Sequence, residues 1–147
     1  MRGSLWYGVG RADRGAAQPQ TRALLAAGAF VVAAPAFAFD GPSGQQIGLQ
    51  EVLVEELGEE TWLRFRFIAP QIARGPEAIA YDVAAPDIEH LCTAVALPYM
   101  VEHALSGQVI VVSLSDRALE FGAADPEATQ YFEAFRAAED RCIWEGF

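Results

Sequence analysis

Lysine is absent from this 147-residue sequence, in which ten arginines face 20 aspartates and glutamates. The formal net charge at pH 7 is −10. Binding to a nucleic-acid backbone depends on clustered Lys and Arg, so the composition argues against a nucleic-acid partner. The hydrophobic share of 52% is large enough for a core and excludes a disordered chain. A chain of this length predicts one domain rather than two.

The motifs of several enzyme classes are also missing. We find no Gly-rich phosphate loop, no dinucleotide fingerprint, no G-x-S-x-G motif, and neither the H-E-x-x-H nor the H-x-x-E-H zinc motif. The sequence therefore predicts no cofactor and favours a non-enzymatic protein.

Residues 1–38 have the pattern of a secretory signal peptide. Arg22 precedes an uncharged apolar run over residues 23–39, which contains the small-x-small site Ala36-Phe37-Ala38. We expect cleavage after Ala38 and a periplasmic or secreted product. The alternative is an uncleaved anchor, but a helix of this run spans about 25 Å, whereas the hydrocarbon core is about 30 Å thick. We therefore expect no stable membrane span after cleavage.

Cleavage would make the protein more acidic. Residues 39–147 contain six Arg and 19 acidic residues, which gives a formal charge of −13. Such a surface repels anionic lipid and nucleic acid. It serves either solubility alone or the attraction of cations or a basic partner.

The only cysteines are Cys92 and Cys142, and both follow the leader. In an exported chain an even cysteine count predicts a disulfide. A metal-binding or redox pair is the alternative, but Cys-x-x-Cys spacing is absent.

The clearest structural prediction is a β-hairpin that begins at Ile47 and ends near Ile68. Residues 39–46, a mostly polar stretch with Gly and Pro, predict a flexible N-terminal segment. Residues 47–147 are predicted to form the single domain. In the hairpin's second half, the side chains at 63, 65 and 67 alternate with the three polar or aromatic side chains at 62, 64 and 66. Beyond the hairpin, the sequence predicts three short strands, near 79–83, 108–115 and 118–121. It also predicts two helices. The first starts at Pro86-Asp87 and is kinked or ended by Pro98, and the second runs from Asp125 to about Asp140. This order predicts an α+β fold with a small, mainly antiparallel sheet, two helices and one disulfide.

Several short motifs give a family resemblance. They are RFRF (64–67), LC (91–92), SLSDR (113–117), EFG (120–122), PEATQYFE (126–133) and CIWE (142–145). With these motifs the chain resembles a domain-of-unknown-function family of small exported bacterial proteins. Some similar chains have the automatic name acetolactate synthase, which implies a large thiamine-diphosphate enzyme. We reject that name, because 109 residues after the leader are too few for such an enzyme and the Gly-Asp-Gly signature is absent.

One candidate interaction surface is the outward side of the hairpin. If Leu63, Phe65 and Phe67 fill the core, then Trp62, Arg64 and Arg66 face away from it. Exposed Trp and Arg are enriched among interface anchors. The alternative is that a second layer covers this side, for example the C-terminal tail with Trp144.

A second candidate is a metal site. His90 and His103, with Glu89 and Glu102, could supply nitrogen and oxygen ligands, although their spacing is not a helical i, i+4 pair. Surface or helix-capping histidines are the simpler interpretation.

Two weaker candidates involve carboxylates and serines. The acidic hairpin tip, residues 55–60, could collect a hard cation, but it lacks EF-hand spacing, and a solvated turn is the simpler interpretation. Ser113, Ser115 and Asp116 end a strand, as hydrolase residues often do, but no nearby histidine can be assigned as their base.

The sequence thus predicts an exported domain that binds an unknown protein or envelope partner. The alternative is a small metal-binding protein or a hydrolase-type enzyme that uses His90, His103 and the nearby acids.

Overall fold

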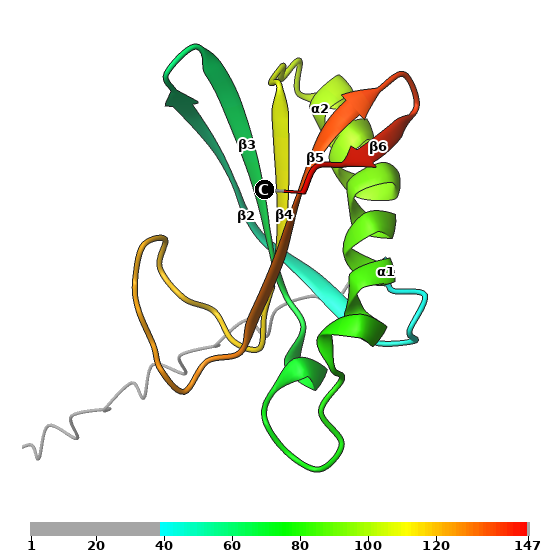
Figure 1. The fold of residues 1–147 in the computed structure, drawn as a ribbon, viewed down its shortest axis with the longest axis vertical. Coiled ribbons are helices and arrows are strands. Elements are labelled where there is room, and N and C mark those ends of the chain that lie inside the picture. Colours follow the sequence, from blue (N-terminus) through cyan, green and yellow to red (C-terminus); the bar gives the residue numbers. More distant parts are fainter. Residues whose placement is uncertain (1–38, 147) are drawn as a thin grey trace, which may run out of the picture. The chain divides into compact units, whose positions relative to one another are not determined.

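A computed structural model describes residues 39–146 of the chain, which form a curled six-stranded sheet with a helix against one face (Figure 1). The strands are β1 (Phe39–Asp40), β2 (Gln46–Leu57), β3 (Glu60–Ile68), β4 (Val109–Ser115), β5 (Gln130–Ala138) and β6 (Arg141–Trp144). They lie side by side in sequence order. The β3–β4 pair is parallel and the other four pairs are antiparallel, so the sheet is mixed, with antiparallel pairing predominant.

The predicted hairpin is confirmed as β2 and β3. The two strands pair from Gly48 with Ile68 to Leu57 with Glu60. The chain reverses in a two-residue turn, where Gly58 has a φ of +66°, a value that glycine adopts without steric cost. A bulge between Leu49 and Glu51 shifts the register once. As predicted, the side chains of Leu63, Phe65 and Phe67 are buried in the main core.

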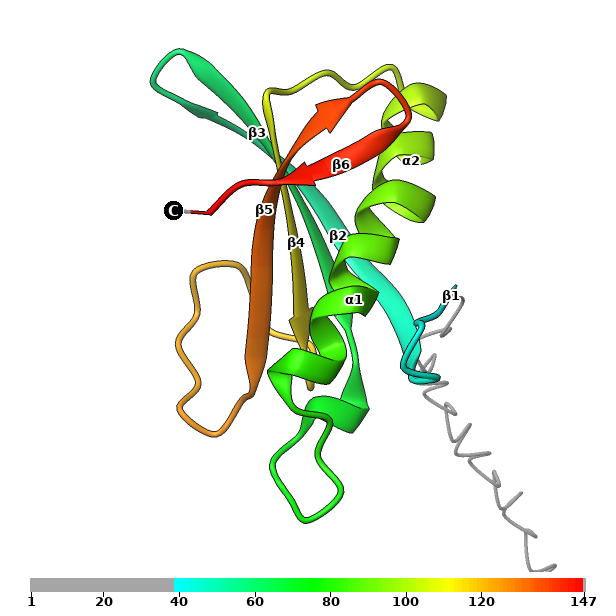
Figure 2. The same cartoon turned by 45° about the vertical axis from the view of Figure 1, so that its right-hand side comes forward.

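One continuous helical segment replaces the two predicted helices (Figure 2). It consists of α1 (Tyr81–Leu91), a π-helical turn η2 (Cys92–Ala96) and α2 (Leu97–Glu102). A short 3-10 helix, η1 (Pro70–Ile72), precedes it. The predicted start at Pro86 is wrong, because the helix begins five residues earlier and Pro86 lies inside α1. The strand predicted near 79–83 is therefore also wrong.

Pro98 does not end the helix. The amide N–H of Leu97 donates to the carbonyl of Cys92, five residues back, which widens the turn just before Pro98. A proline has no N–H and its ring crowds the preceding turn, so a π-type turn lets the helix continue past it.

The second predicted helix is wrong as well. Residues 116–129 form a loop, so the strand predicted at 118–121 is absent, and residues 130–138 form β5, which pairs with β4 from Ile110–Phe135 to Ser115–Gln130. The motif at Asp125 builds a turn rather than a helix N-terminus: its carboxylate accepts the amide N–H of Glu127 at 2.9 Å. The run QYFEAFRAA has apolar residues at both helical and strand spacing, and pairing with β4 decides between them.

Residues 39–46, expected to be a flexible start, form β1 and a turn that is tied to the helix. Asp87 is fully buried, and its carboxylate accepts the Ser43 amide at 2.8 Å and the Ser43 hydroxyl at 2.6 Å. The Gln45 side-chain amide donates to the same carboxylate. The sequence predicted that Asp87 lies at the start of the helix, but the acidic residue in the first turn of α1 is Asp82. Asp87 therefore serves to fasten the N-terminal turn.

The predicted disulfide joins Cys92 of η2 to Cys142 of β6, with the two Cα atoms 6.1 Å apart. Both half-cystines lie in the main core between the helix and the sheet. The bond therefore fastens the edge strand β6 to the middle of the helical segment. Within residues 39–146, we find no helix of sufficient length and apolarity to cross a bilayer.

Candidate binding site on the open face of the sheet

The side of the sheet that carries Trp62, Arg64 and Arg66 faces away from the helix, and we call it the open face. Trp62 packs there against a small second cluster formed by Val109, Val111 and Ala134. The alternation predicted for this strand is therefore correct, but the three side chains are not free anchors. Trp62 and Arg64 are partly buried, and the side chain of Arg66 is only 11% exposed.

Both arginines on the open face are paired with glutamates of the neighbouring strand. Arg64 donates through Nε to Glu55, and Arg66 donates through Nη1 to Glu51. Arg66 also donates through Nη2 to the carbonyl of Leu119, at 3.0 Å. The two positive charges are thus balanced locally, and Arg66 is fixed at two of its nitrogens.

The loop 116–129 crosses the open face and covers these arginines. The ring of Phe121 lies 5.6 Å from the guanidinium carbon of Arg64 and 5.6 Å from that of Arg66, within the range of a cation–π contact. The Trp62 ring lies 5.5 Å from Arg64. The Leu119 carbonyl also accepts a bond from Gln50 at 2.7 Å. The second layer is therefore this loop rather than Trp144, whose indole N–H donates to Glu133.

Arg117 holds the loop closed at its base. Its guanidinium lies 2.9 Å from Asp116 and 3.6 Å from Asp125, and it donates to the Glu127 carbonyl at 3.3 Å. Burial pushes the pKa of Asp116 upward, but hydrogen bonds from Arg117 and with the Thr129 backbone, and the positive charge of Arg117, hold it below its ordinary value. The carboxylate of Asp116 pushes the pKa of Arg117 upward in turn. Asp116 is therefore part of a structural lock.

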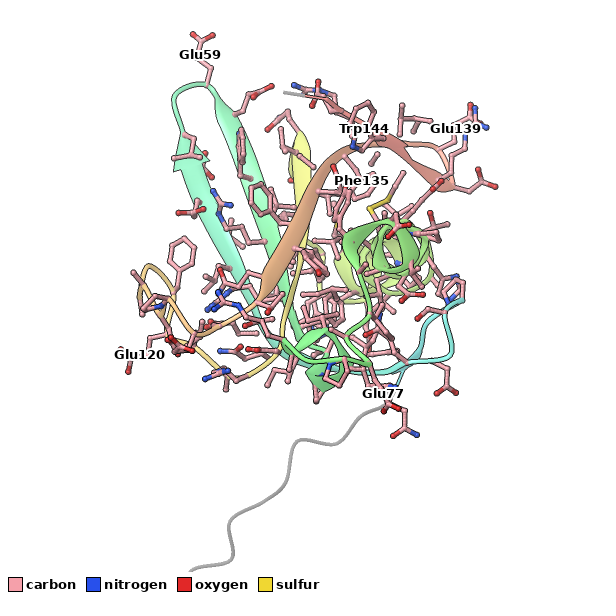
Figure 3. The ribbon with its side chains drawn as sticks, turned by 60° about the horizontal axis from the view of Figure 1, so that its bottom comes forward. Glu59, Glu77, Glu120, Phe135, Glu139 and Trp144 are labelled. Carbon is pink, nitrogen blue, oxygen red and sulfur yellow. A yellow bond between two sulfur atoms is a disulfide. The ribbon has the colours of Figure 1, made fainter. Side chains whose placement is uncertain are left out.

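A cavity of about 260 Å³ lies between this loop and the open face. Its lining includes Arg64, Arg66, Ser113, Ser115, Phe121 and Phe132. Figure 3 places Glu120 on the loop, on the side of the sheet away from the helix. The side chains of Phe121 and Phe132 are 51% and 69% exposed, so the cavity has two partly exposed aromatic side chains in its wall.

The predicted metal site does not form. Glu89, His90, Glu102 and His103 are all exposed, and the two histidines are separated by about 20 Å of helix at 1.5 Å per residue. The ring of His103 stacks on Tyr99, with the centroids 4.1 Å apart. No group of three or more His, Cys, Asp or Glu side chains among residues 39–146 has an arrangement that would hold a metal ion.

The remaining candidates from the sequence are also dispersed. At the hairpin, Glu55 pairs with Arg64, Glu60 pairs with Arg136, and Figure 3 shows Glu59 extending alone from the tip. Ser113 and Ser115 line the cavity on the open face, whereas His90 lies in α1 and His103 directly follows α2, on the other face. No serine–histidine pair for nucleophilic catalysis forms among the described residues.

Comparison with known proteins gives one match. The profile of a family of unknown function, DUF6497, matches residues 20–147. The chain belongs to this family. The expected resemblance to a domain-of-unknown-function family is thereby confirmed. No curated protein and no solved structure matches the chain significantly.

The DUF6497 match includes every residue of the cavity wall, but it assigns no role to any of them. Sequence reasoning identified Arg64 and Arg66 and missed Phe121 and Phe132. It placed Phe121 in a strand and Phe132 in a helix. In a strand over 130–138, the side chain of Phe132 lies on the other face of the sheet from those of Tyr131 and Glu133. This alternation could have corrected the prediction for Phe132.

Proposed function

We propose that this DUF6497 protein is exported, loses residues 1–38, and acts as a non-enzymatic domain that binds a protein or envelope partner through the open face of its sheet. The signal-peptide pattern supports export, and the Cys92–Cys142 disulfide is compatible with an oxidising compartment.

The observation that favours binding is the pair of exposed phenylalanines at the cavity. Phe132 projects from β5 at 69% exposure, and Phe121 lies on the loop that covers Arg64 and Arg66. Large apolar side chains next to a preformed cavity with a few polar groups are typical of a binding site. In this proposal Trp62, Arg64 and Arg66 form and support the floor of the site rather than an exposed anchor.

Export is tested by native mass spectrometry of the protein expressed with its own leader and isolated from the periplasm. We expect a mass that begins at Phe39 and is two hydrogens lighter than the reduced chain. A full-length mass, or a cytoplasmic product with both thiols free, would contradict export.

Binding is tested in living cells with the photoreactive residue p-benzoylphenylalanine in place of Phe132. The matched control carries it in place of Val101, which is 83% exposed on α2, in the helical segment on the opposite face of the sheet, and does not line the cavity. We expect a discrete crosslinked product from position 132 that is absent from position 101 and is weakened by Phe121→Ser. Identical products from both positions, or none from position 132, would contradict binding through the open face.

A further inference from the structure

The cavity on the open face has features that specify the chemistry of its occupant. We propose that it binds an uncharged apolar group that carries a carbonyl oxygen, such as an apolar residue within the chain of a protein partner. This inference rests on the proposed function, because it specifies what the open face binds.

The first feature is a buried hydroxyl that has no partner. Ser115 is 6% exposed and lines the cavity, and within residues 39–146 its Oγ makes no hydrogen bond. A buried hydroxyl without a partner is costly, so such groups are rare in native structures and call for an explanation. A ligand oxygen in the cavity would satisfy it.

The second feature is an excess of hydrogen-bond donors. Arg64 uses Nε for Glu55, and among the described residues no hydrogen bond is made by its two terminal nitrogens. Its guanidinium carbon lies 5.5 Å from the Trp62 ring and 5.6 Å from the Phe121 ring, and these two contacts reduce the ordering that it needs before it binds. A guanidinium can only donate, so Arg64 favours an acceptor atom on the ligand.

The third feature is the balance of charge, which separates a neutral acceptor from a carboxylate. Arg64 and Arg66 are already matched by Glu55 and Glu51, and Glu120 adds a further negative charge at the cavity wall. Residues 39–147 together contain six Arg and 19 acidic residues. An anionic ligand would meet no uncompensated positive charge and would approach a strongly negative protein. A neutral carbonyl avoids this repulsion and can accept the same bonds.

The fourth feature is the size of the cavity and its apolar wall. Val111, Phe121 and Phe132 contribute apolar surface to a volume of about 260 Å³. An apolar cavity of about 150 Å³ holds benzene, so this volume accepts one ring or branched side chain together with an amide group. A sugar would bring several hydroxyl groups that need hydrogen-bond partners, which the side chains of Val111, Phe121 and Phe132 do not supply, and this favours a peptide residue.

The test titrates three probes into the ¹⁵N-labelled, disulfide-bonded chain without its leader and follows amide chemical shifts. The probes are N-acetylphenylalanine amide, the corresponding acid N-acetylphenylalanine, and N-acetylglucosamine. We expect saturable shifts at residues 113–115, 121–123 and 130–132 with the amide. We expect the acid to bind about fivefold more weakly or worse, from the repulsion of one added charge near the carboxylates.

Three outcomes would overturn the inference. They are the absence of saturable shifts at the cavity with the amide, an acid that binds as well as the amide, and N-acetylglucosamine that binds better than the amide. The second would point to a carboxylate ligand and the third to a carbohydrate of the envelope.

A pair of variants separates binding from folding. Ser115→Ala removes the buried hydroxyl at the cavity, and Thr129→Val removes another buried hydroxyl without a partner that is not part of the cavity lining. We expect neither variant to lower the urea midpoint, because neither removes a hydrogen bond within the chain. Ser115→Ala should weaken the amide about two- to tenfold, the value of one neutral hydrogen bond, and Thr129→Val should not. Equal affinities of both variants would overturn the assignment of Ser115.

Failure of this inference can be told apart from failure of the proposed function. A specific crosslink from position 132 together with no binding of the amide would leave the open face as an interaction surface with a different ligand chemistry. Binding of the amide without any crosslink in cells would support the proposed ligand chemistry of the cavity and would contradict the binding of a partner in cells.

Discussion

The disulfide between Cys92 and Cys142 should supply a large part of the stability of this domain. The bond closes a loop with a sequence separation of 50 residues. In the chain-entropy model, a loop of that length lowers the entropy of the unfolded state by an amount worth about 4 kcal/mol at 25 °C. Domains of this size unfold with about 5–15 kcal/mol in total, so reduction should remove between a quarter and most of the stability.

The measurement is urea unfolding of residues 39–147, in the oxidised form and after reduction. With a urea dependence of about 2 kcal/mol per molar, the midpoint should fall by about 2 M on reduction. The double variant Cys92→Ala, Cys142→Ala should fall at least as far, because both sulfurs lie in the main core and their loss also leaves space there. Reductant should leave the double variant unchanged, which is the control. A reduced wild type whose midpoint stays within about 0.5 M of the oxidised form would refute the reasoning.

Two further predictions concern buried carboxylates. Asp87→Asn should lower the free energy of unfolding, measured in urea, by about 2–4 kcal/mol, because it replaces the charged acceptor of three donors. The control Asp82→Asn, in the exposed first turn, should change it by less than about 1 kcal/mol. Equal effects of the two variants would contradict the role of Asp87. The pKa of Asp116 is lowered in the folded state, so its contribution is present above the unfolded pKa and is lost as the pH falls through the folded value. The wild type should therefore be more stable than Asp116→Asn at pH 7, and this difference should shrink in urea titrations between pH 4 and pH 2; a constant difference would contradict the lock with Arg117.

The parts of the fold that were predicted correctly are segments whose sequence pattern fits only a strand, and the disulfide, which is a covalent constraint. Leu63, Phe65 and Phe67 alternate with polar or aromatic partners, and residues 109–115 begin with four consecutive β-branched residues, so each segment favours a strand whatever surrounds it. The disulfide was predictable from the cysteine count together with the signal-peptide pattern of residues 1–38.

The errors arose where local motifs were compatible with two structures. Pro86 is typical of a first helical turn, yet the helix begins at Tyr81 because packing of Ala84, Ile88 and Leu91 against the sheet outweighs the hydrogen bond that the proline removes. Residues 130–138 fit a helix or a strand, and only the free edge of β4 made the strand the better structure. The sheet that packs against the helix and the strand β4 that pairs with residues 130–138 are both separated from these segments in the sequence. Local reasoning therefore could not decide between the two structures.

The candidate site was predictable only in its floor. The alternation in β3 put Arg64 and Arg66 on one face, but what that face does depends on what covers it. The cover is a loop whose position is set by bonds that connect distant residues: Gln50 and Arg66 to the Leu119 carbonyl, and Arg74 to the Pro126 carbonyl. These bonds convert two arginines from interface anchors into charge-balanced donors beneath an aromatic ring. The same residues would recruit an anion if the loop and the glutamates were absent, and favour a neutral ligand with them in place.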